Sequence, residues 1–403
     1  MQTVFRRYYE ELTMTRSVPV LENREFGFAS FEGRMIRHQS FRNEEQLVAF
    51  LRDFAPRDAY VSCGYYEDPI AEMEKKGWLG ADLVFDIDAD HIPTDCDKYH
   101  DEWACGNCSF TGRGIVPEKC PVCGGEKFDV STWPCETCLA SARNETVKLL
   151  DMLMHDFGFS QEEVAVFFSG HRGYHVHVES ESVKRLDSTA RKEIVDYICG
   201  LGLDLSLGGL GLKDFKTTKR YQGLHSGKLG WSERISAGMK DVILNANDQS
   251  LLNIGVGRKE ARVLLSNKDR LLRGRSDTSV IGGVKGVGVE SWRKIAEHSV
   301  KTKSAKVDTV VTTDIHRLIR LQGTLHGKTG FKKVEFPVSA LDDFDPFRSA
   351  IAFKEGEITV LISKAPEFRL GDEMFGPYKG EKVELPTVAA ILLICRGRAE
   401  VVK

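Results

Sequence analysis

The stretch Leu83-Val84-Phe85-Asp86-Ile87-Asp88-Ala89-Asp90 alternates acids with apolar residues in its second half. Successive side chains of a β-strand point to opposite faces, so a strand here puts Asp86 and Asp88 on one face. The Cα atoms of Asp86 and Asp88 would lie roughly 6.5–7 Å apart, because a strand rises about 3.3 Å per residue. Two carboxylates on a rigid strand suit divalent cations, and two-metal phosphoryl-transfer sites hold their ions roughly 3.5–4 Å apart. A strand end with solvated acids is the alternative.

The composition indicates a globular protein with more than one structural unit. The chain has 403 residues, 41% hydrophobic and 29% charged, which is too long for one simple core. Its longest apolar run, Val388–Cys395, is shorter than the roughly 20 residues that span a membrane. Met1–Tyr9 has basic residues without a following apolar segment, unlike a secretory signal. We therefore expect a cytoplasmic protein with no membrane span.

The charge balance gives no overall attraction to nucleic acid. Lys and Arg number 56 and Asp and Glu 59, for a formal net charge of −3. Binding to a phosphate backbone would therefore need local basic surfaces. The candidate stretches are Lys213–Arg220, Arg258–Arg275 and Arg317–Lys333. A solvated helix face is an equally simple explanation of each stretch taken alone.

The cysteines are clustered, since seven of the 10 fall in residues 96–138. Two C-x2-C turns, with eleven residues between them, have the spacing of a zinc ribbon. Such turns face each other and hold one tetrahedral ion through four thiolates at about 2.3 Å. The predicted ribbon ligands are Cys105, Cys108, Cys120 and Cys123.

A second set of metal ligands flanks this ribbon on both sides. The set consists of Cys96, His100, Cys135 and Cys138. We predict a zinc knuckle that carries the ribbon inside its loop, and so two structural zinc ions in all. Disulfides are the alternative, and a cytosolic location disfavours them.

The remaining periodicity predicts alternating helices and strands. Helices are expected at Glu44–Phe54, from Asn144 to Gly158, and at Arg191–Ile198, Lys259–Leu265 and Ser291–Val300. Strands are expected at Ala59–Cys63, Ala81–Asp88, Val164–Phe168, Tyr174–Val178, Lys306–Val311 and Glu357–Ser363. The glycine-rich segment Val284–Gly288 precedes a helix. Its backbone N–H groups could bind a phosphate, or the glycines could simply allow the chain to enter the helix.

Two further clusters carry polar chemistry. Ser169-Gly170-His171-Arg172-Gly173-Tyr174-His175 forms a predicted hairpin tip, where glycines allow a ligand close to the backbone. Its hydroxyl, guanidinium and imidazole groups are suitable donors to a triphosphate. Asp308 on a predicted short strand is followed by the Arg- and His-bearing segment Arg317–Lys328. Taken alone, a capped turn and partly buried histidines explain both clusters.

In this order, the motifs strongly resemble the small catalytic subunit of the archaeal and eukaryotic type of DNA primase. The resemblance covers about residues 5–350 and includes Arg24–Phe28 and Asp343–Phe347. Two features depart from the family pattern. The ribbon Cys105–Cys123 replaces a compact knuckle, and His171 occupies a position that is often Arg.

The resemblance implies an α+β fold, with a mixed-sheet core similar to RNA-recognition domains. The core would comprise residues 1–182 and 301–350, with a helical subdomain inserted at 183–300. The zinc-binding module would span 96–138, and residues 351–403 would pack on the core.

The resemblance also implies a reaction and its residues. Asp86, Asp88 and Asp308 would hold two Mg²⁺ or Mn²⁺ ions for template-directed synthesis of short RNA primers on single-stranded DNA. The nucleotide-binding residues would be Ser169, Arg172, His175, Arg320 and His326. The substrates would be ribonucleotide or deoxyribonucleotide triphosphates. The partner would be a separate primase large subunit, forming a heterodimer.

Three alternatives stay open at this point. A repair or translesion primase-polymerase of the same superfamily shares the acid pair and the hairpin. A non-catalytic zinc-ribbon DNA-binding adaptor would need no third acid. A metallonuclease would degrade DNA without nucleotides.

Overall fold

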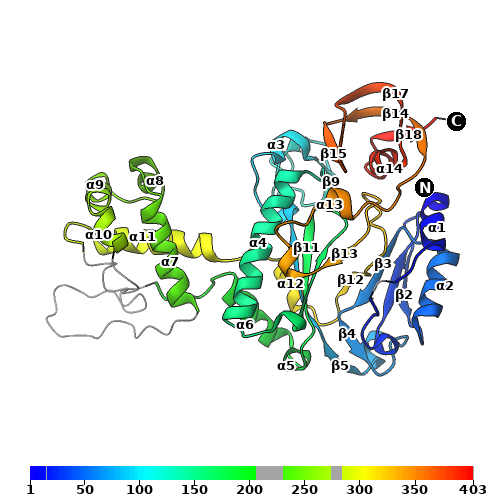
Figure 1. The fold of residues 1–403 in the computed structure, drawn as a ribbon, viewed down its shortest axis with the longest axis horizontal. Coiled ribbons are helices and arrows are strands. Elements are labelled where there is room, and N and C mark those ends of the chain that lie inside the picture. Colours follow the sequence, from blue (N-terminus) through cyan, green and yellow to red (C-terminus); the bar gives the residue numbers. More distant parts are fainter. Residues whose placement is uncertain (15, 206–229, 274–283, 403) are drawn as a thin grey trace. The chain divides into compact units, whose positions relative to one another are not determined.

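The computed structural model describes residues 1–14, 16–205, 230–273 and 284–402 (Figure 1). They divide into two compact units. Unit 1 contains Met1–Thr146, Ser160–Lys192 and Val307–Lys403, and unit 2 contains Val147–Phe159 and Glu193–Lys306. The basic stretch Lys213–Arg220 lies outside the described residues.

Two four-stranded sheets form the centre of unit 1. The first has the order β12-β3-β1-β2, with β12 Leu318–Arg320, β3 Asp58–Ser62, β1 Phe26–Ala29 and β2 Met35–Gln39. The second has the order β13-β10-β11-β6, with β13 Val334–Phe336, β10 Val164–Phe168, β11 Gly173–Val178 and β6 Leu83–Asp88. All neighbouring strands in both sheets are antiparallel. The α+β class is confirmed, but the expected mixture of parallel and antiparallel strands is wrong.

Helices α1 (Gln2–Glu10) and α2 (Glu44–Phe54) cover one face of the first sheet (Figure 1). Helix α2 has the predicted bounds, and the Asn43 side chain caps it by accepting the Gln46 N–H at 3.0 Å. The apolar core under these helices includes Phe5, Phe26, Phe28, Leu47 and Leu51, all of them fully buried. Burying each such side chain contributes about 1.5–3 kcal/mol.

The C-terminal segment packs on this same core. Helix α14 (Thr387–Cys395) places Ile391 in the cluster, where its side chain is 1% exposed. A three-stranded sheet of order β17-β14-β18 accompanies the helix, with β14 Glu357–Ala365, β17 Tyr378–Pro386 and β18 Ala399–Val401. The strand predicted at Glu357–Ser363 therefore lies within β14.

The hairpin of β10 and β11 follows the predicted pattern closely. Strand β10 has the predicted bounds, and β11 begins one residue earlier than expected, at Gly173. Gly173 pairs with Asp88, and a Cβ at this position would lie 2.1 Å from the Ile87 carbonyl oxygen. Only glycine allows β11 to approach β6 this closely, so Gly173 sets how near the hairpin comes to the acidic strand.

Two predicted elements are wrong. Helix α4 runs from Glu136 to His155, so Asn144 lies inside it and does not cap it. Asp308 is not on a strand but is the N-cap of α12 (Thr309–Thr313), where Oδ1 accepts the N–H groups of Val310 at 2.9 Å and Val311 at 3.3 Å. The β-branched run Thr309–Thr313 favours a strand by propensity, but the aspartate cap stabilises a helical turn instead.

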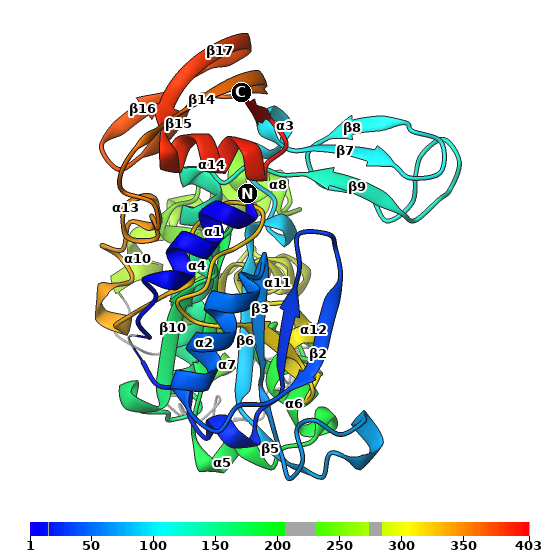
Figure 2. The same ribbon diagram turned by 90° about the vertical axis from the view of Figure 1, so that its right-hand side faces the viewer.

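The predicted zinc-binding region forms its own small sheet of order β8-β7-β9, which projects from its neighbours in unit 1 (Figure 2). Its strands are β7 Glu102–Cys105, β8 Thr111–Arg113 and β9 Phe128–Ser131. The other helices and strands of unit 1 are β4 Gly64–Tyr66, β5 Trp78–Ala81, α3 Asp97–His100, α5 Glu181–Lys184, α13 Pro346–Ser349, β15 Phe368–Leu370 and β16 Glu373–Phe375.

Unit 2 is helical in its described residues. Its helices are α7 Trp231–Leu244, α8 Asp248–Asn253, α9 Arg258–Ser266, α10 Lys268–Arg273 and α11 Val289–Lys303, with the C-terminal parts of α4 and α6 (Ser188–Ile198). Before α11, the Gly288 N–H donates to Glu260 Oε1 at 2.6 Å. A carboxylate of the same unit therefore already accepts the hydrogen bond that a phosphate would need from this amide. None of the helices in the described ranges is long and apolar enough to cross a membrane.

Candidate active site

The three predicted catalytic acids come from two elements of unit 1. In the β6–β11 pair, Asp86 lies opposite His175, and His175 Nε2 is 3.6 Å from Asp86 Oδ1. The Asp308 N–H donates to the Asp86 carbonyl oxygen at 2.8 Å. The structure therefore brings the cap of α12 to the strand that carries the acid pair.

The charges of the three acids act on one another. Burial, together with the neighbouring carboxylates of Asp88 and Asp308, raises the pKa of Asp86 to about 7, although the charge of Lys333 acts in the opposite direction. A carboxyl group that is partly buried and repelled by two other acids is stabilised by a bound cation. Oxygen donors in such a cluster match the preference of Mg²⁺ and Mn²⁺.

The hairpin tip lies beside the loop that follows β12. Ser169 Oγ accepts the His171 N–H at 3.3 Å, and Thr329 Oγ1 donates to the Gly170 carbonyl oxygen at 2.5 Å. The rings of His171 and His326 stack with their centroids 4.9 Å apart. The structure thus brings together two predicted clusters that are about 155 residues apart in the chain.

The histidines of this corner are neutral. Burial lowers the pKa values of His171, His175 and His326 well below the usual range, and nearby cations lower them further. A neutral imidazole still offers one N–H donor and one nitrogen acceptor. These rings therefore suit hydrogen bonding to a ligand more than they suit charge neutralisation.

Arg320 is held in place by a residue that the sequence did not reveal. Its Nη1 donates to Asp58 Oδ1 at 2.8 Å and to the Leu325 carbonyl oxygen at 3.1 Å. Beside it, Lys333 Nζ donates to the Arg320 carbonyl oxygen at 3.0 Å, and burial lowers the pKa of Lys333 to about 7. Asp58 had no motif to mark it, because its partner Arg320 is 262 residues away, and Lys333 was marked only as the end of the basic stretch Arg317–Lys333.

Arg172 has a different environment from the one expected of a nucleotide ligand. Its side chain is fully buried and its Nη1 lies 2.7 Å from Asp90 Oδ1 and 2.8 Å from Asp101 Oδ2. Its Nη2 donates to Cys138 Sγ at 3.1 Å. The guanidinium therefore joins the turn after β6 to the predicted zinc knuckle.

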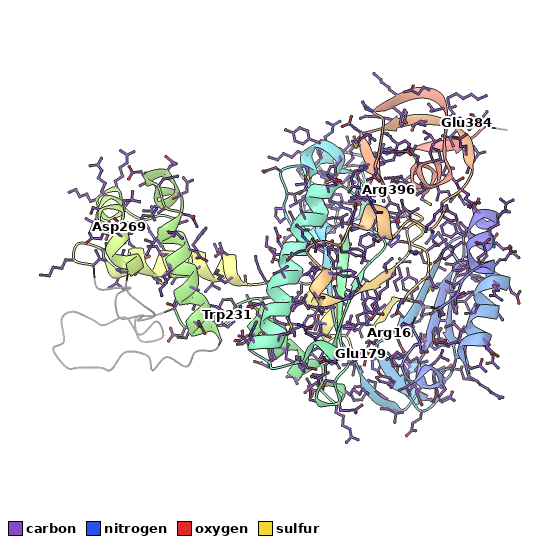
Figure 3. All side chains as sticks on the ribbon, viewed as in Figure 1. Arg16, Glu179, Trp231, Asp269, Glu384 and Arg396 are labelled. Atoms are coloured by element: carbon purple, nitrogen blue, oxygen red, sulfur yellow. The ribbon has the colours of Figure 1, made fainter. Side chains whose placement is uncertain are left out.

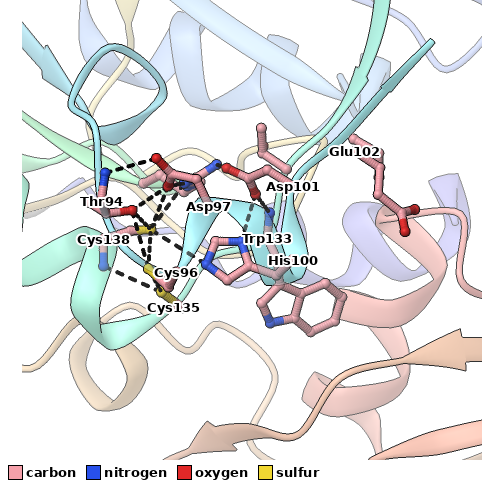
Figure 4. Close-up of polar contacts among 12 residues, drawn as sticks. Thr94, Cys96, Asp97, His100, Asp101, Glu102, Trp133, Cys135 and Cys138 are labelled. Carbon is pink, nitrogen blue, oxygen red and sulfur yellow. Dashed lines mark hydrogen bonds and ion pairs between the residues drawn. The ribbon is translucent and has the colours of Figure 1, made fainter. Parts of the chain in front are cut away.

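The four predicted knuckle ligands gather in one place, with their ligand atoms within 4.8 Å of one another. Cys96 Sγ lies 3.4 Å from Cys138 Sγ and 3.6 Å from Cys135 Sγ, and His100 Nε2 lies 3.6 Å from Cys138 Sγ (Figure 4). A tetrahedral ion bound at about 2.3 Å sets its ligands about 3.8 Å apart. Three cysteines and one histidine at these distances fit a zinc ion.

Asp101 orients this set and was not identified from the sequence. It accepts a hydrogen bond from His100 Nδ1 at 2.7 Å, which leaves Nε2 free for the metal (Figure 4). A carboxylate in this position is typical of histidine ligands to zinc. Its position directly after His100 was the one available signal.

The ribbon ligands form a second group within the same limit of 4.8 Å. Cys105 Sγ is 3.6 Å from Cys123 Sγ, and Cys108 Sγ is 3.6 Å from Cys120 Sγ. Cys105 and Cys120 are buried, whereas Cys108 and Cys123 are exposed. Both predicted groups are therefore assembled, one beside the acidic strand and one in the projecting sheet.

Replacing Arg172 by Met is expected to destabilise unit 1 by about 3–5 kcal/mol, because it leaves the buried Asp101 and the half-buried Asp90 without their cation. Thermal and urea unfolding of the purified protein measure the change. The matched control is Arg348→Met, since Arg348 and Asp372 form an exposed ion pair that is worth about 0–1 kcal/mol. Equal stabilities of the two variants would contradict the role of the buried cluster.

Comparisons with known proteins agree with these features. A family model described as DNA primase small subunit matches residues 129–338. The DNA primase small subunit PriS of Methanothrix thermoacetophila is 33% identical, over 98% of this chain and 97% of that protein. The PriS proteins of Cenarchaeum symbiosum and Nitrosopumilus maritimus are 32% and 30% identical, over 98% and 100% of this chain and 96% and 98% of theirs.

Proposed function

The chain belongs to the family of DNA primase small subunits, and we propose that it makes primers by a two-metal mechanism at Asp86, Asp88 and Asp308. Family membership makes the protein a nucleotidyltransferase and the catalytic subunit of a DNA primase. The observation that carries the proposed site is the hydrogen bond from the Asp308 amide to Asp86, which brings the third acid to the acidic strand.

The three carboxylates would hold two Mg²⁺ or Mn²⁺ ions. When bound, such ions activate the attacking 3′-hydroxyl and stabilise the pyrophosphate leaving group. The protein's own contribution is rigidity, because Asp86 and Asp88 lie on a hydrogen-bonded strand and Asp308 is fixed by its bonds to the first turn of α12.

The incoming nucleotide would bind across the hairpin tip and the loop after β12. Ser169, His175 and His326 supply neutral hydrogen-bond donors, and Arg320 supplies positive charge from a position fixed by Asp58. Donors that are already oriented need little rearrangement when negative charge develops on the phosphates. The resemblance also assigns Arg172 to the nucleotide. Its guanidinium is buried and forms ion pairs with Asp90 and Asp101, so it would hold the hairpin tip in place.

The metal of the two cysteine clusters would be zinc. Thiolate-rich tetrahedral sets of this kind are structural sites, and they are poor ligands for Mg²⁺. The division into the catalytic core, the module 96–138, the helical subdomain 183–300 and the C-terminal segment 351–403 remains part of the proposal.

The partners would be a single-stranded DNA template, nucleoside triphosphates and a separate primase large subunit. Template binding by this nearly neutral chain would depend on local basic surfaces and would weaken with salt.

The function is tested by a priming assay on single-stranded DNA with ribonucleotides and Mg²⁺ or Mn²⁺, with and without a large subunit. We expect short RNA products that begin from two nucleotides and disappear with EDTA. Extension of a supplied primer without any start from nucleotides would favour the repair or translesion polymerase. Degradation of labelled DNA without nucleotides would favour a metallonuclease, and DNA binding alone would favour the adaptor.

A further inference from the structure

Arg396 is an arginine of the C-terminal segment that lies at the predicted nucleotide site. It is the C-cap residue of α14, and its Nη1 is 3.3 Å from Nε2 of His171 at the hairpin tip (Figure 3). A ring nitrogen of His171 in turn lies within 4.8 Å of a carboxylate oxygen of Asp88. The end of α14 therefore reaches the corner where the hairpin and the acidic strand meet.

The charge of Arg396 has no counter-ion in the part of the chain that the structure describes. Its other contact is from Nη2 to Thr132 Oγ1 at 3.4 Å, and its Nε is buried without a hydrogen-bond partner. Among the described residues, no carboxylate forms an ion pair with it. Asp90 and Asp101, whose charges act on Arg396, are already paired with Arg172.

The surroundings of Arg396 are electropositive. Burial and the nearby charge of Arg172 lower the pKa of Arg396 to about 10, against a smaller opposite effect of Asp90 and Asp101, and the group stays protonated at neutral pH. Arg396 and Lys328 both lower the pKa of His326, which shows that these cations act on the same loop. A half-buried cation among other cations is costly unless an anion completes the site.

We propose that Arg396 binds the triphosphate of the incoming nucleotide, as a nucleotide-binding residue supplied by the C-terminal segment. The inference rests on the proposed function, because the anion it assigns is the substrate of that site. A triphosphate fits better than a template phosphate for two reasons. It must lie beside the metal-holding acids, and it can reach His171, His326 and Arg396 at once. The guanidinium would also supply the charge that the neutral ring of His171 lacks.

The test compares Arg396→Gln with the wild type in the full chain, together with its large subunit where that is needed for activity. We expect the KM for ATP to rise about 10–100-fold, since a charge-assisted bond to phosphate is lost. Inhibition by inorganic triphosphate should weaken by a similar factor, while zinc content and melting temperature stay unchanged. The matched control is Arg398→Gln, because Arg398 is already paired with Glu102 at 3.2 Å.

Rescue provides a second, independent measurement. In the Arg396→Gln background, His171→Arg puts a guanidinium on the side chain that Arg396 contacts, and it should recover much of the lost ATP affinity. An unchanged KM and an unchanged inhibition by triphosphate in Arg396→Gln would overturn the inference. Weaker binding of single-stranded DNA with normal ATP kinetics would overturn it too, in favour of a template contact. If the wild type itself makes no primers, the proposed function fails instead.

Discussion

Asp86→Asn and Asp88→Asn should each reduce nucleotide incorporation by about 10³-fold or more, because each removes a charged ligand from the proposed metal-binding pair. The structure predicts that the fold survives the change. Asparagine has nearly the same shape, and Asp86 is repelled by Asp88 and Asp308. The measurement is incorporation of labelled nucleotide on a primed template, with zinc content and circular dichroism taken in parallel.

Asp86→Asn is also expected to increase the stability of the fold, by an amount that depends on pH. The pKa of Asp86 is raised from about 4 in the unfolded chain to about 7 in the fold. The protonated form therefore stabilises the fold at low pH, and this contribution is lost as the pH rises to about 7. In EDTA, Asp86→Asn should equal the wild type in stability near pH 4 and exceed it above pH 7.

The matched control is Asp53→Asn, which changes an exposed acid on α2 far from these contacts. It should leave both incorporation and stability unchanged. Normal incorporation by Asp86→Asn would show that the metal assignment is wrong, whatever the zinc content. Loss of the folded state in that variant would leave Asp88→Asn to decide the matter, since Asp88 is partly exposed at the strand end.

Cys138→Ser should remove one zinc ion and destabilise unit 1 strongly. Cys138 is fully buried, contacts Cys96 and His100, and accepts a hydrogen bond from Arg172. Loss of the metal would release this whole cluster, and structural zinc is worth about 10–16 kcal/mol in small zinc-binding peptides. In a larger unit with its own core we expect a smaller loss, but still one of several kcal/mol.

Cys123→Ser is the informative comparison because it removes a ligand from the other predicted zinc site. Cys123 is exposed in the projecting sheet and contacts only its ribbon partners among the described residues. This variant should also lose one zinc ion, yet keep the melting temperature of the core. Metal analysis should find close to two zinc ions in the wild type and one in each variant. Equal destabilisation by both substitutions would contradict the separate roles of knuckle and ribbon.

Local sequence patterns predicted those helices and strands whose bounds depend only on neighbouring residues. Helix α2 and strand β10 have their predicted bounds, because capping residues and apolar runs act over a few neighbours. The helix around Asn144 begins earlier than predicted, at Glu136, where the Cys138 N–H donates to Cys135 Sγ at 3.3 Å and so fixes a first turn that propensity does not mark. Asp308 lies next to Asp86, as a shared site requires, but the sequence placed it on the wrong element.

The site shows the same division between near and distant contacts. The spacing of the cysteines predicted both ligand sets, since C-x2-C turns are local geometry. The partners of Arg172 and Arg320 were not predictable, because Asp101 and Asp58 lie 71 and 262 residues away from them. No pattern indicated that Arg396 lies beside His171, at a separation of 225 residues.

The sequence by itself determined the acid pair on a strand, the two ligand sets and the order of motifs, because these depend on short-range periodicity and spacing. Only the tertiary structure decided which charges are paired. It buried Arg172 between Asp90 and Asp101, and among the described residues it gave Arg396 no carboxylate partner. The physical reason is that a buried charge is stabilised or not by the groups that folding places around it, and sequence neighbours do not specify those groups.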